Sequence, residues 1–166
     1  WIKGTESTPA REPVAPGVQV IGNHEFELIA LSGHTEGDLV ILDRGTGVLF
    51  AGDLVFHNRA PTTPHATMAQ WFAALDRLDA ISYRTMVPGH GDPVSDGRAV
   101  QQTRHYLRWV ESALRQAAER GDEMAEVLGL AVPAEFAAIP LSREEFARSV
   151  AHLYRRYEAG TLSRPR

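Results

Sequence analysis

Three short segments of the sequence place a glycine directly before a side chain that can bind a metal ion. They are SGHT at 32–35, GD at 52–53 and PGHG at 88–91, and their metal-competent side chains are His34, Asp53 and His90. Each segment follows a β-rich run, and glycine lets the backbone turn sharply where a strand ends. If the three strands are neighbours in one sheet, the three side chains point towards a common centre.

The donor atoms of these side chains suit zinc. Neutral imidazole and carboxylate oxygens bind zinc at about 2.0–2.2 Å, and catalytic zinc keeps one position open for water. A carboxylate can bridge two metals about 3.5–4 Å apart, so Asp53 is the candidate bridging ligand. Iron accepts a similar donor set. The pattern therefore predicts one or two zinc ions, with iron as the alternative.

Each segment taken singly is more typical of an ordinary turn than of a metal site. Gly-Asp, Gly-His and Pro-Gly-His-Gly all occur in plain turns after strands. The metal hypothesis depends on finding all three in this order, each directly behind a β-rich run.

The elements that must position these residues are strands in the first part of the chain and helices in the second. β-Rich runs predict strands at 19–21, 25–31, 38–43, 48–51 and 85–87, with an irregular segment from 52 to 64. Apolar residues at three- and four-residue intervals predict helices at about 67–78, 96–121, 123–130 and 142–158. The strands are too few to close a sheet of their own, so we expect part of a larger layered α/β fold.

Three stretches resemble the C-terminal half of the metallo-β-lactamase-fold hydrolases over about residues 25–95. They are GHTEGDLVIL (33–42), LFAGDLVF (49–56) and MVPGHGDPV (86–94). The resemblance implies an α/β fold, namely the C-terminal half of a metallo-β-lactamase-type αββα sandwich. It also implies that His34 serves the first metal, His90 the second, and Asp53 both.

A narrower resemblance is to the group called quinoprotein relay system zinc metallohydrolases. It is carried by AGDLVFHNRAPT (51–62), WFAALDRL (71–78) and REEFARSVAHLYRRYE (143–158). Members of that group accompany quinone-dependent dehydrogenase systems, which implies a similar setting for this chain but no particular substrate.

The family's other ligand motif, His-x-His-x-Asp-His, occurs nowhere in the 166 residues. The histidines outside the three segments are scattered: His24, His57, His65, His105 and His152. In the family the motif lies in an N-terminal half of about 100 residues, by domain-size reckoning. With a start at Trp1 rather than at a methionine, we expect a chain that begins just after that half.

We therefore expect a single partial domain over 1–166. It comprises a loop or linker over 1–17, a strand-rich metal-site section over 18–95 and a helical section over 96–166. A second chain or an upstream segment would supply the missing half. Because catalytic zinc usually has three protein ligands, this chain alone should bind zinc weakly and show little or no activity.

Three further residues are weaker candidates. Thr35 and Asp38 follow His34 closely, and either could orient its imidazole by a hydrogen bond on the side away from the metal. A role in capping the turn is equally compatible with their residue types. His57 lies four residues beyond Asp53 and could face a small-molecule substrate, although an exposed loop histidine is the more common case.

The reaction that these residues predict is metal-assisted hydrolysis of an ester, thioester, amide or phosphoester, in which zinc-activated hydroxide attacks the substrate. Iron-dependent redox chemistry on the same fold and a non-catalytic binding partner are the alternatives. A net charge of −4 argues against nucleic acid as a partner. No apolar run approaches the roughly 20 residues of a membrane span, and the absence of cysteine excludes disulfides and thiolate zinc sites.

Overall fold

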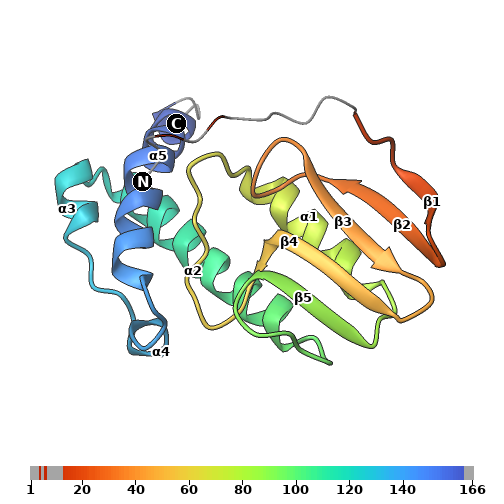
Figure 1. Ribbon diagram of the computed structural model, residues 1–166. Coiled ribbons are helices and arrows are strands. Elements are labelled where there is room, and N and C mark those ends of the chain that lie inside the picture. The colour runs from red at the N-terminus through yellow and green to blue at the C-terminus, as the bar shows by residue number, and fades with distance from the viewer. Residues whose placement is uncertain (1–3, 5, 7–12, 163–166) are drawn as a thin grey trace.

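A five-stranded mixed sheet and the helices that cover it make up the computed structural model, which describes residues 4, 6 and 13–162 (Figure 1). The strands are β1 (Gly17–Ile21), β2 (His24–Leu31), β3 (Asp38–Asp43), β4 (Val48–Phe56) and β5 (Thr85–His90), in the spatial order of the sequence. The helices are α1 (Met68–Asp79), α2 (Arg98–Arg120), α3 (Met124–Leu128), α4 (Ala134–Ala137) and α5 (Ser142–Leu162).

The chain arrangement confirms the predicted α/β class. Neighbouring strands are antiparallel up to β4, whereas β4 and β5 are parallel and α1 forms the crossover between them. Most of the predicted linker over 1–17 lies outside the described residues, and its last residue, Gly17, already belongs to β1. None of the described helices is long and apolar enough to cross a membrane.

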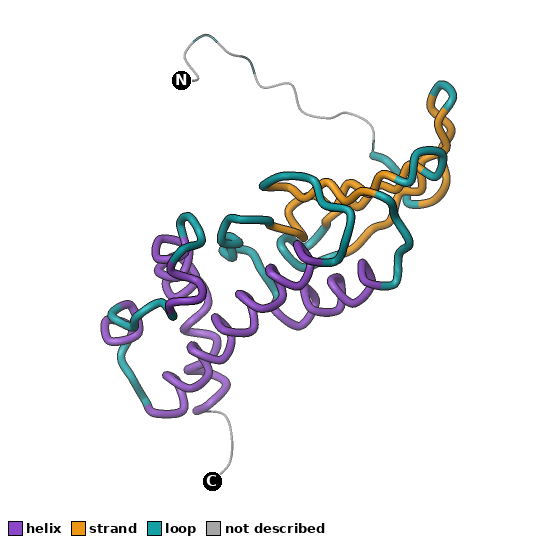
Figure 2. Tube along the Cα trace, turned by 90° about the horizontal axis from the view of Figure 1, so that it is seen from below, coloured by secondary structure: helices purple, strands orange, loops and turns teal. Residues whose placement is uncertain are grey.

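One face of the sheet is covered by α1 and α2, which lie beneath it in Figure 2. Val40 of β3, Leu49 of β4 and Trp71 of α1 are completely buried in this layer. Beyond the sheet, α2 continues and packs against α5, where Tyr106, Leu114 and Tyr154 are also buried. The core therefore lies between the sheet and α1–α2 and extends into the helical section.

The opposite face of the sheet is also apolar, and no helix among the described residues covers it (Figure 2). Leu28, Ile41 and Phe50 form a row across three strands, because Leu28 pairs with Ile41 and Ile41 with Phe50. Phe50 is 43% exposed and the neighbouring Leu39 is 40% exposed. A strand that is apolar on both faces is typical of a sheet that lies inside a layered fold.

Two strands continue beyond their predicted C-terminal ends. β4 continues to Phe56 through a segment expected to be irregular, and β5 continues through Pro88 to His90. Pro88 is tolerated because β5 is the edge strand of the sheet, where a missing N–H donor breaks little pairing. Helix α4 was not predicted, since four residues are too short for a helical period to show.

The turn between β3 and β4 is closed by the carboxylate of Asp43. Its Oδ1 accepts hydrogen bonds from the backbone N–H groups of Gly45 and Thr46, and its Oδ2 lies 2.7 Å from His24 Nδ1. Hydrogen bonding by the Thr46 side chain, followed by that of His24 and the backbone, outweighs the effect of burial and lowers the pKa of Asp43 to about 2. This turn sets the start of β4, the strand that carries Asp53.

Asp43 should therefore make the stability of the chain depend on acid. Its folded pKa lies below the value of about 3.9 for an unfolded aspartate. Its contribution is fully present above the unfolded pKa and is lost as the pH falls towards 2. Asp43→Asn should lower the free energy of unfolding at neutral pH and flatten its decline in acid, measured by urea unfolding at about pH 7, 5 and 3. The exposed Glu119, changed to Gln, should keep the wild-type slope, and an equal slope for Asp43→Asn would contradict the prediction.

Candidate metal centre

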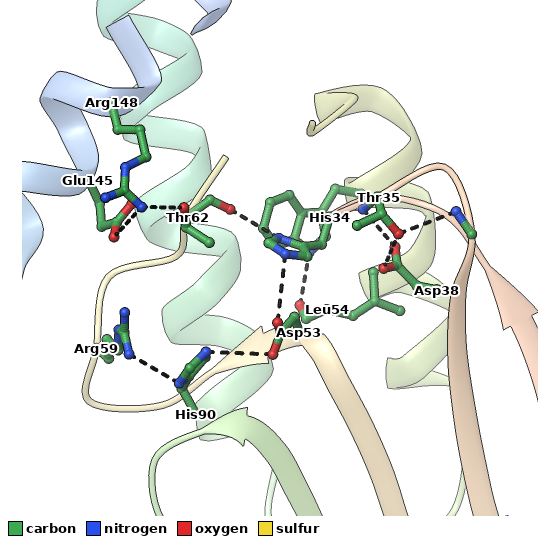
Figure 3. Close-up of polar contacts among 12 residues, drawn as sticks. His34, Thr35, Asp38, Asp53, Leu54, Arg59, Thr62, His90, Glu145 and Arg148 are labelled. Atoms are coloured by element: carbon green, nitrogen blue, oxygen red, sulfur yellow. Dashed lines mark hydrogen bonds and ion pairs between the residues drawn. The ribbon is translucent and has the colours of Figure 1, made fainter. Parts of the chain in front are cut away.

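The carboxylate of Asp53 lies between the imidazoles of His34 and His90 (Figure 3). His34 Nε2 is 3.7 Å from Asp53 Oδ2, and His90 Nε2 is 3.7 Å from Asp53 Oδ1. The side chain of His34 is 14% exposed, that of His90 35% and that of Asp53 43%. The structure thus brings together the three side chains named from the sequence, with one histidine on each oxygen of the aspartate.

Asp53 reaches this position from a break inside β4 and not from the tip of a strand, which corrects the sequence-based expectation. Gly52 pairs with Pro88 and Phe56 with His90, so residues 53–55 of β4 lie opposite Gly89 alone. Gly52 has a φ of +54°, a left-handed conformation that favours glycine. Such a bulge turns a side chain out of the regular alternation of a strand, and here it directs Asp53 towards the two histidines.

His34 is fixed in the orientation of a metal ligand. Its Nδ1 is 3.0 Å from the carbonyl oxygen of Thr62, which can only accept, so Nδ1 carries the ring proton and donates it. Nε2 is then left with a free electron pair that faces Asp53. The ring packs edge-on against Trp71 at a centroid distance of 5.3 Å, and Trp71 Nε1 donates to the carbonyl oxygen of Leu54. A carbonyl that fixes the ring from behind is a common partner of a zinc-binding histidine.

His90 is held differently. Its ring stacks on Phe56 at a centroid distance of 4.9 Å. Nη1 of Arg59 lies 3.2 Å from His90 Nδ1, and because a guanidinium can only donate, this contact leaves the ring proton on Nε2. A histidine that binds metal through Nε2 must carry its proton on Nδ1 instead. His90 therefore suits a metal only when it no longer accepts from Arg59.

The spacing of the three side chains fits zinc, although the set is incomplete. Two ligands bound at about 2.0–2.2 Å in a tetrahedral arrangement lie about 3.3–3.6 Å apart, close to the 3.7 Å between each imidazole nitrogen and its carboxylate oxygen. Each of the two prospective metal positions has one imidazole nitrogen and one carboxylate oxygen from this chain. Within the described residues, no group of three His, Cys, Asp or Glu side chains is placed so that all three could hold a single metal ion.

The weaker candidates lie beside the centre but do not face it. Thr35 Oγ1 donates to Asp38 Oδ1 at 2.8 Å, and the Thr35 N–H donates to Asp38 Oδ2, so these residues close the turn that carries His34. The hydrogen-bond partner of the His34 imidazole is instead Thr62. His57 Nδ1 lies 3.0 Å from the carbonyl oxygen of Asp92, which ties the end of β4 to the loop after β5.

Sequence reasoning missed the residues that orient the ligands. Thr62 and Arg59 lie on the segment 57–67, for which the sequence offered no periodic pattern. The stacking of Phe56 on His90 could have been expected only from the longer β4, because Phe56 pairs with His90 in the sheet.

Helix α5 holds the segment 57–67 in place. Thr63 Oγ1 and Ser149 Oγ are 2.6 Å apart and both buried, and Arg156 donates to the carbonyl oxygen of Ala66. The N–H of Ala60 donates to the carbonyl oxygen of Pro140, just before the helix. The orientation of His34 therefore depends, through Thr62, on a helix more than a hundred residues further along the chain.

Comparisons with known proteins show which family the chain resembles. A family model described as the metallo-beta-lactamase superfamily matches residues 5–90. A hydroxyacylglutathione hydrolase from Rhodobacter capsulatus is 37% identical over 92 residues, which are 54% of this chain and 36% of that protein.

Solved structures give the same picture. A metallo-beta-lactamase from Pontibacter korlensis is similar with a TM-score of 0.54 and 25% identity, over 64% of this chain and 52% of that one. A metallo-beta-lactamase family protein from Thermus thermophilus shares the fold with a TM-score of 0.61 at 21% identity, over 92% and 50%. The chain thus spans about a third of the curated relative and about half of these structures.

A methyl group at position 89 should disturb Asp53. A Cβ added to Gly89 would lie 2.7 Å from the carbonyl carbon of Gly52 and 2.8 Å from the backbone nitrogen of Asp53, closer than real contacts allow. Gly89→Ala should therefore lower the free energy of unfolding by about 1–3 kcal/mol, the usual range for overpacking. Gly97→Ala is the matched control, because nothing lies within 4 Å of its Cβ. Equal stability of the two variants in urea unfolding would show that β5 does not approach Asp53 this closely.

Proposed function

Because the chain belongs to the metallo-beta-lactamase superfamily, we propose that it forms the C-terminal half of a zinc-dependent hydrolase. The observation that carries the proposal is the symmetric placement of His34 and His90, each 3.7 Å from a different oxygen of Asp53. In this proposal His34 binds one zinc ion, His90 binds a second, and Asp53 binds both.

Each residue has a defined task in the reaction. Zinc supplies Lewis acidity, which activates water for attack and polarises the bond to be hydrolysed. His34 keeps its Nε2 free for a metal because Thr62 holds the proton on Nδ1. Asp53, which lies beside both imidazoles, would supply negative charge to any metal held at either position. No separate protein nucleophile is required.

The substrate class is an ester, thioester, amide or phosphoester. A relative named for the hydrolysis of a hydroxyacyl-glutathione supports an acyl substrate within that range. The proposal includes the narrower assignment to the quinoprotein relay system zinc metallohydrolases. It is supported by the three stretches that resemble that group: 51–62 covers the end of β4 and the loop that carries Arg59, 71–78 lies in α1, and 143–158 lies in α5.

The proposal also includes a second chain or upstream segment that completes the site. Each metal position has one imidazole nitrogen and one carboxylate oxygen from this chain, whereas catalytic zinc usually has three protein ligands. The uncovered apolar surface at Leu39, Ile41 and Phe50 supports the same conclusion, because exposed apolar surface of this kind marks an interface. One added layer could cover this face and supply the remaining ligands.

Removal of the shared carboxylate should abolish activity. In the completed protein, Asp53→Ala should lower kcat by about a thousandfold or more and reduce the bound zinc, because both metals lose a ligand. Turnover of acyl esters and elemental analysis of the same preparation test this together. Glu119→Ala, an exposed carboxylate on α2, should leave both unchanged. Full activity in a metal-free Asp53→Ala protein would overturn the proposal, and stoichiometric iron in the wild type would favour redox chemistry instead.

The isolated chain should bind zinc weakly. With two donors for each metal, competition against a chromophoric chelator should show an affinity at least about a hundredfold below that of the completed protein, since lost ligands cost more than lost supporting contacts. Denaturing mass spectrometry of the native protein should show a second polypeptide or a longer chain. A monomer of these 166 residues alone, carrying two tightly bound zinc ions, would contradict the prediction.

A further inference from the structure

Trp71 of α1 lies behind the metal centre and contacts two of its supports. Its indole Nε1–H donates to the carbonyl oxygen of Leu54, the residue that follows Asp53, at 2.9 Å. Its ring meets the imidazole of His34 edge-on at a centroid distance of 5.3 Å. The side chain of Trp71 is completely buried, so it can act on the metal centre only through the groups that it touches.

The hydrogen bond to Leu54 is made inside the bulge of β4. Residues 53–55 form this bulge, between the two points at which β4 is paired with β5. Leu54 is completely buried, and a buried carbonyl without a donor would cost free energy. The indole N–H supplies the donor from the helix. It therefore stabilises the peptide that follows Asp53 in the bulged conformation, which turns the carboxylate towards the two imidazoles.

The loop that carries His34 is held against the same helix. The N–H of Thr67, at the start of α1, donates to the carbonyl oxygen of Gly33 at 3.2 Å. A Cβ added to Gly33 would lie 2.6 Å from the Cα of Trp71, so this close approach requires glycine. Trp71 thus contacts the ring of His34 directly and holds the peptide beside Asp53 by a hydrogen bond, which relates the positions of these two side chains.

The same indole reaches the third metal-competent side chain through Phe56. The ring centroids of Trp71 and Phe56 are 6.4 Å apart, and Phe56 stacks on His90. Packing alone does not require an indole, because Leu75 and Leu78 of the same helix are equally buried in this layer. What distinguishes Trp71 from these leucines is the N–H group, which a buried tryptophan usually pairs with an acceptor.

We infer that Trp71 is a positioning residue of the metal centre. Its indole N–H holds the Leu54 carbonyl and so keeps the Asp53 carboxylate turned towards both imidazoles. This inference rests on the proposed function, but it concerns a residue that touches neither metal nor substrate. Because Asp53 serves both metals, loss of the N–H should weaken zinc binding at both positions.

Replacement of Trp71 by 3-benzothienylalanine tests the hydrogen bond alone, because sulfur takes the place of the N–H in a ring of similar shape. In the completed protein, the zinc affinity, measured by competition with a chromophoric chelator, should fall by about tenfold or more. At limiting zinc, kcat for an acyl ester should fall while KM changes by less than about twofold, because the buried indole does not face the substrate. Trp71→Phe should lose at least as much zinc affinity. Wild-type zinc affinity in the benzothienylalanine variant would overturn the inference.

Leu78→Ala is the matched control for a purely structural role. Leu78 is also completely buried on α1 but lies about two turns further along the helix. Leu78→Ala and Trp71→Phe should both lower the urea midpoint, because each leaves a cavity in the core. Zinc affinity should fall in Trp71→Phe alone. An equal loss of zinc affinity in Leu78→Ala would show that Trp71 acts through stability, and the inference would be wrong.

A measurement without metal separates the failure of this inference from the failure of the proposed function. In the metal-free completed protein, labelled with ¹³C and ¹⁵N, loss of the indole N–H should shift the carbonyl resonance of Leu54 and the amide resonance of Val55. The amide of Glu119, exposed on α2, should not move. Unchanged resonances at Leu54 and Val55 would contradict the inference. A wild type that binds no zinc would overturn the proposed function, and the same shifts would still show that the indole holds the bulge.

Discussion

The parallel pairing of β4 with β5, and its interruption at Gly52, determines where the metal-competent side chains lie. Pairing resumes at Phe56 and His90, so the intervening part of β4 bulges and Asp53 leaves the plane of the sheet. The same pairing stacks Phe56 on His90 and brings Gly89 against the backbone of Asp53. His34 joins from the loop between β2 and β3, closed by Thr35 and Asp38. Without the interruption, the strand would alternate regularly and Asp53 could not face both histidines.

Much of this arrangement could be predicted from the sequence, because the strands and long helices have strong periodic patterns. The identities of His34, Asp53 and His90 and the α/β class follow from local composition and motif order. The bulge was not predictable, since the register between two strands separated by a helix is a tertiary property. Nor were the partners Thr62 and Arg59, which lie in an aperiodic loop whose path is set by contacts with a distant helix.

Two independent properties of the described residues support the proposal that a second chain or an upstream segment completes the site. Among the described residues, the metal centre has donors on one side of each prospective ion, and the sheet has helices on one of its two apolar faces. Burial of the exposed Leu39 and Phe50 would be favourable by the hydrophobic effect alone, whatever metal is present. In the proposed complete protein, one added layer would cover this face and supply the remaining ligands.

The dependence of the ligand loop on α5 has an evolutionary consequence. Ser149 contacts the hydroxyl of Thr63 and Arg156 donates to the carbonyl oxygen of Ala66, both on the segment that carries Thr62. Substitutions along this helix can accordingly shift the loop by small amounts while His34, Asp53 and His90 remain unchanged. Related chains could therefore diverge in substrate preference through substitutions in their C-terminal helix, while the metal-binding side chains stay the same.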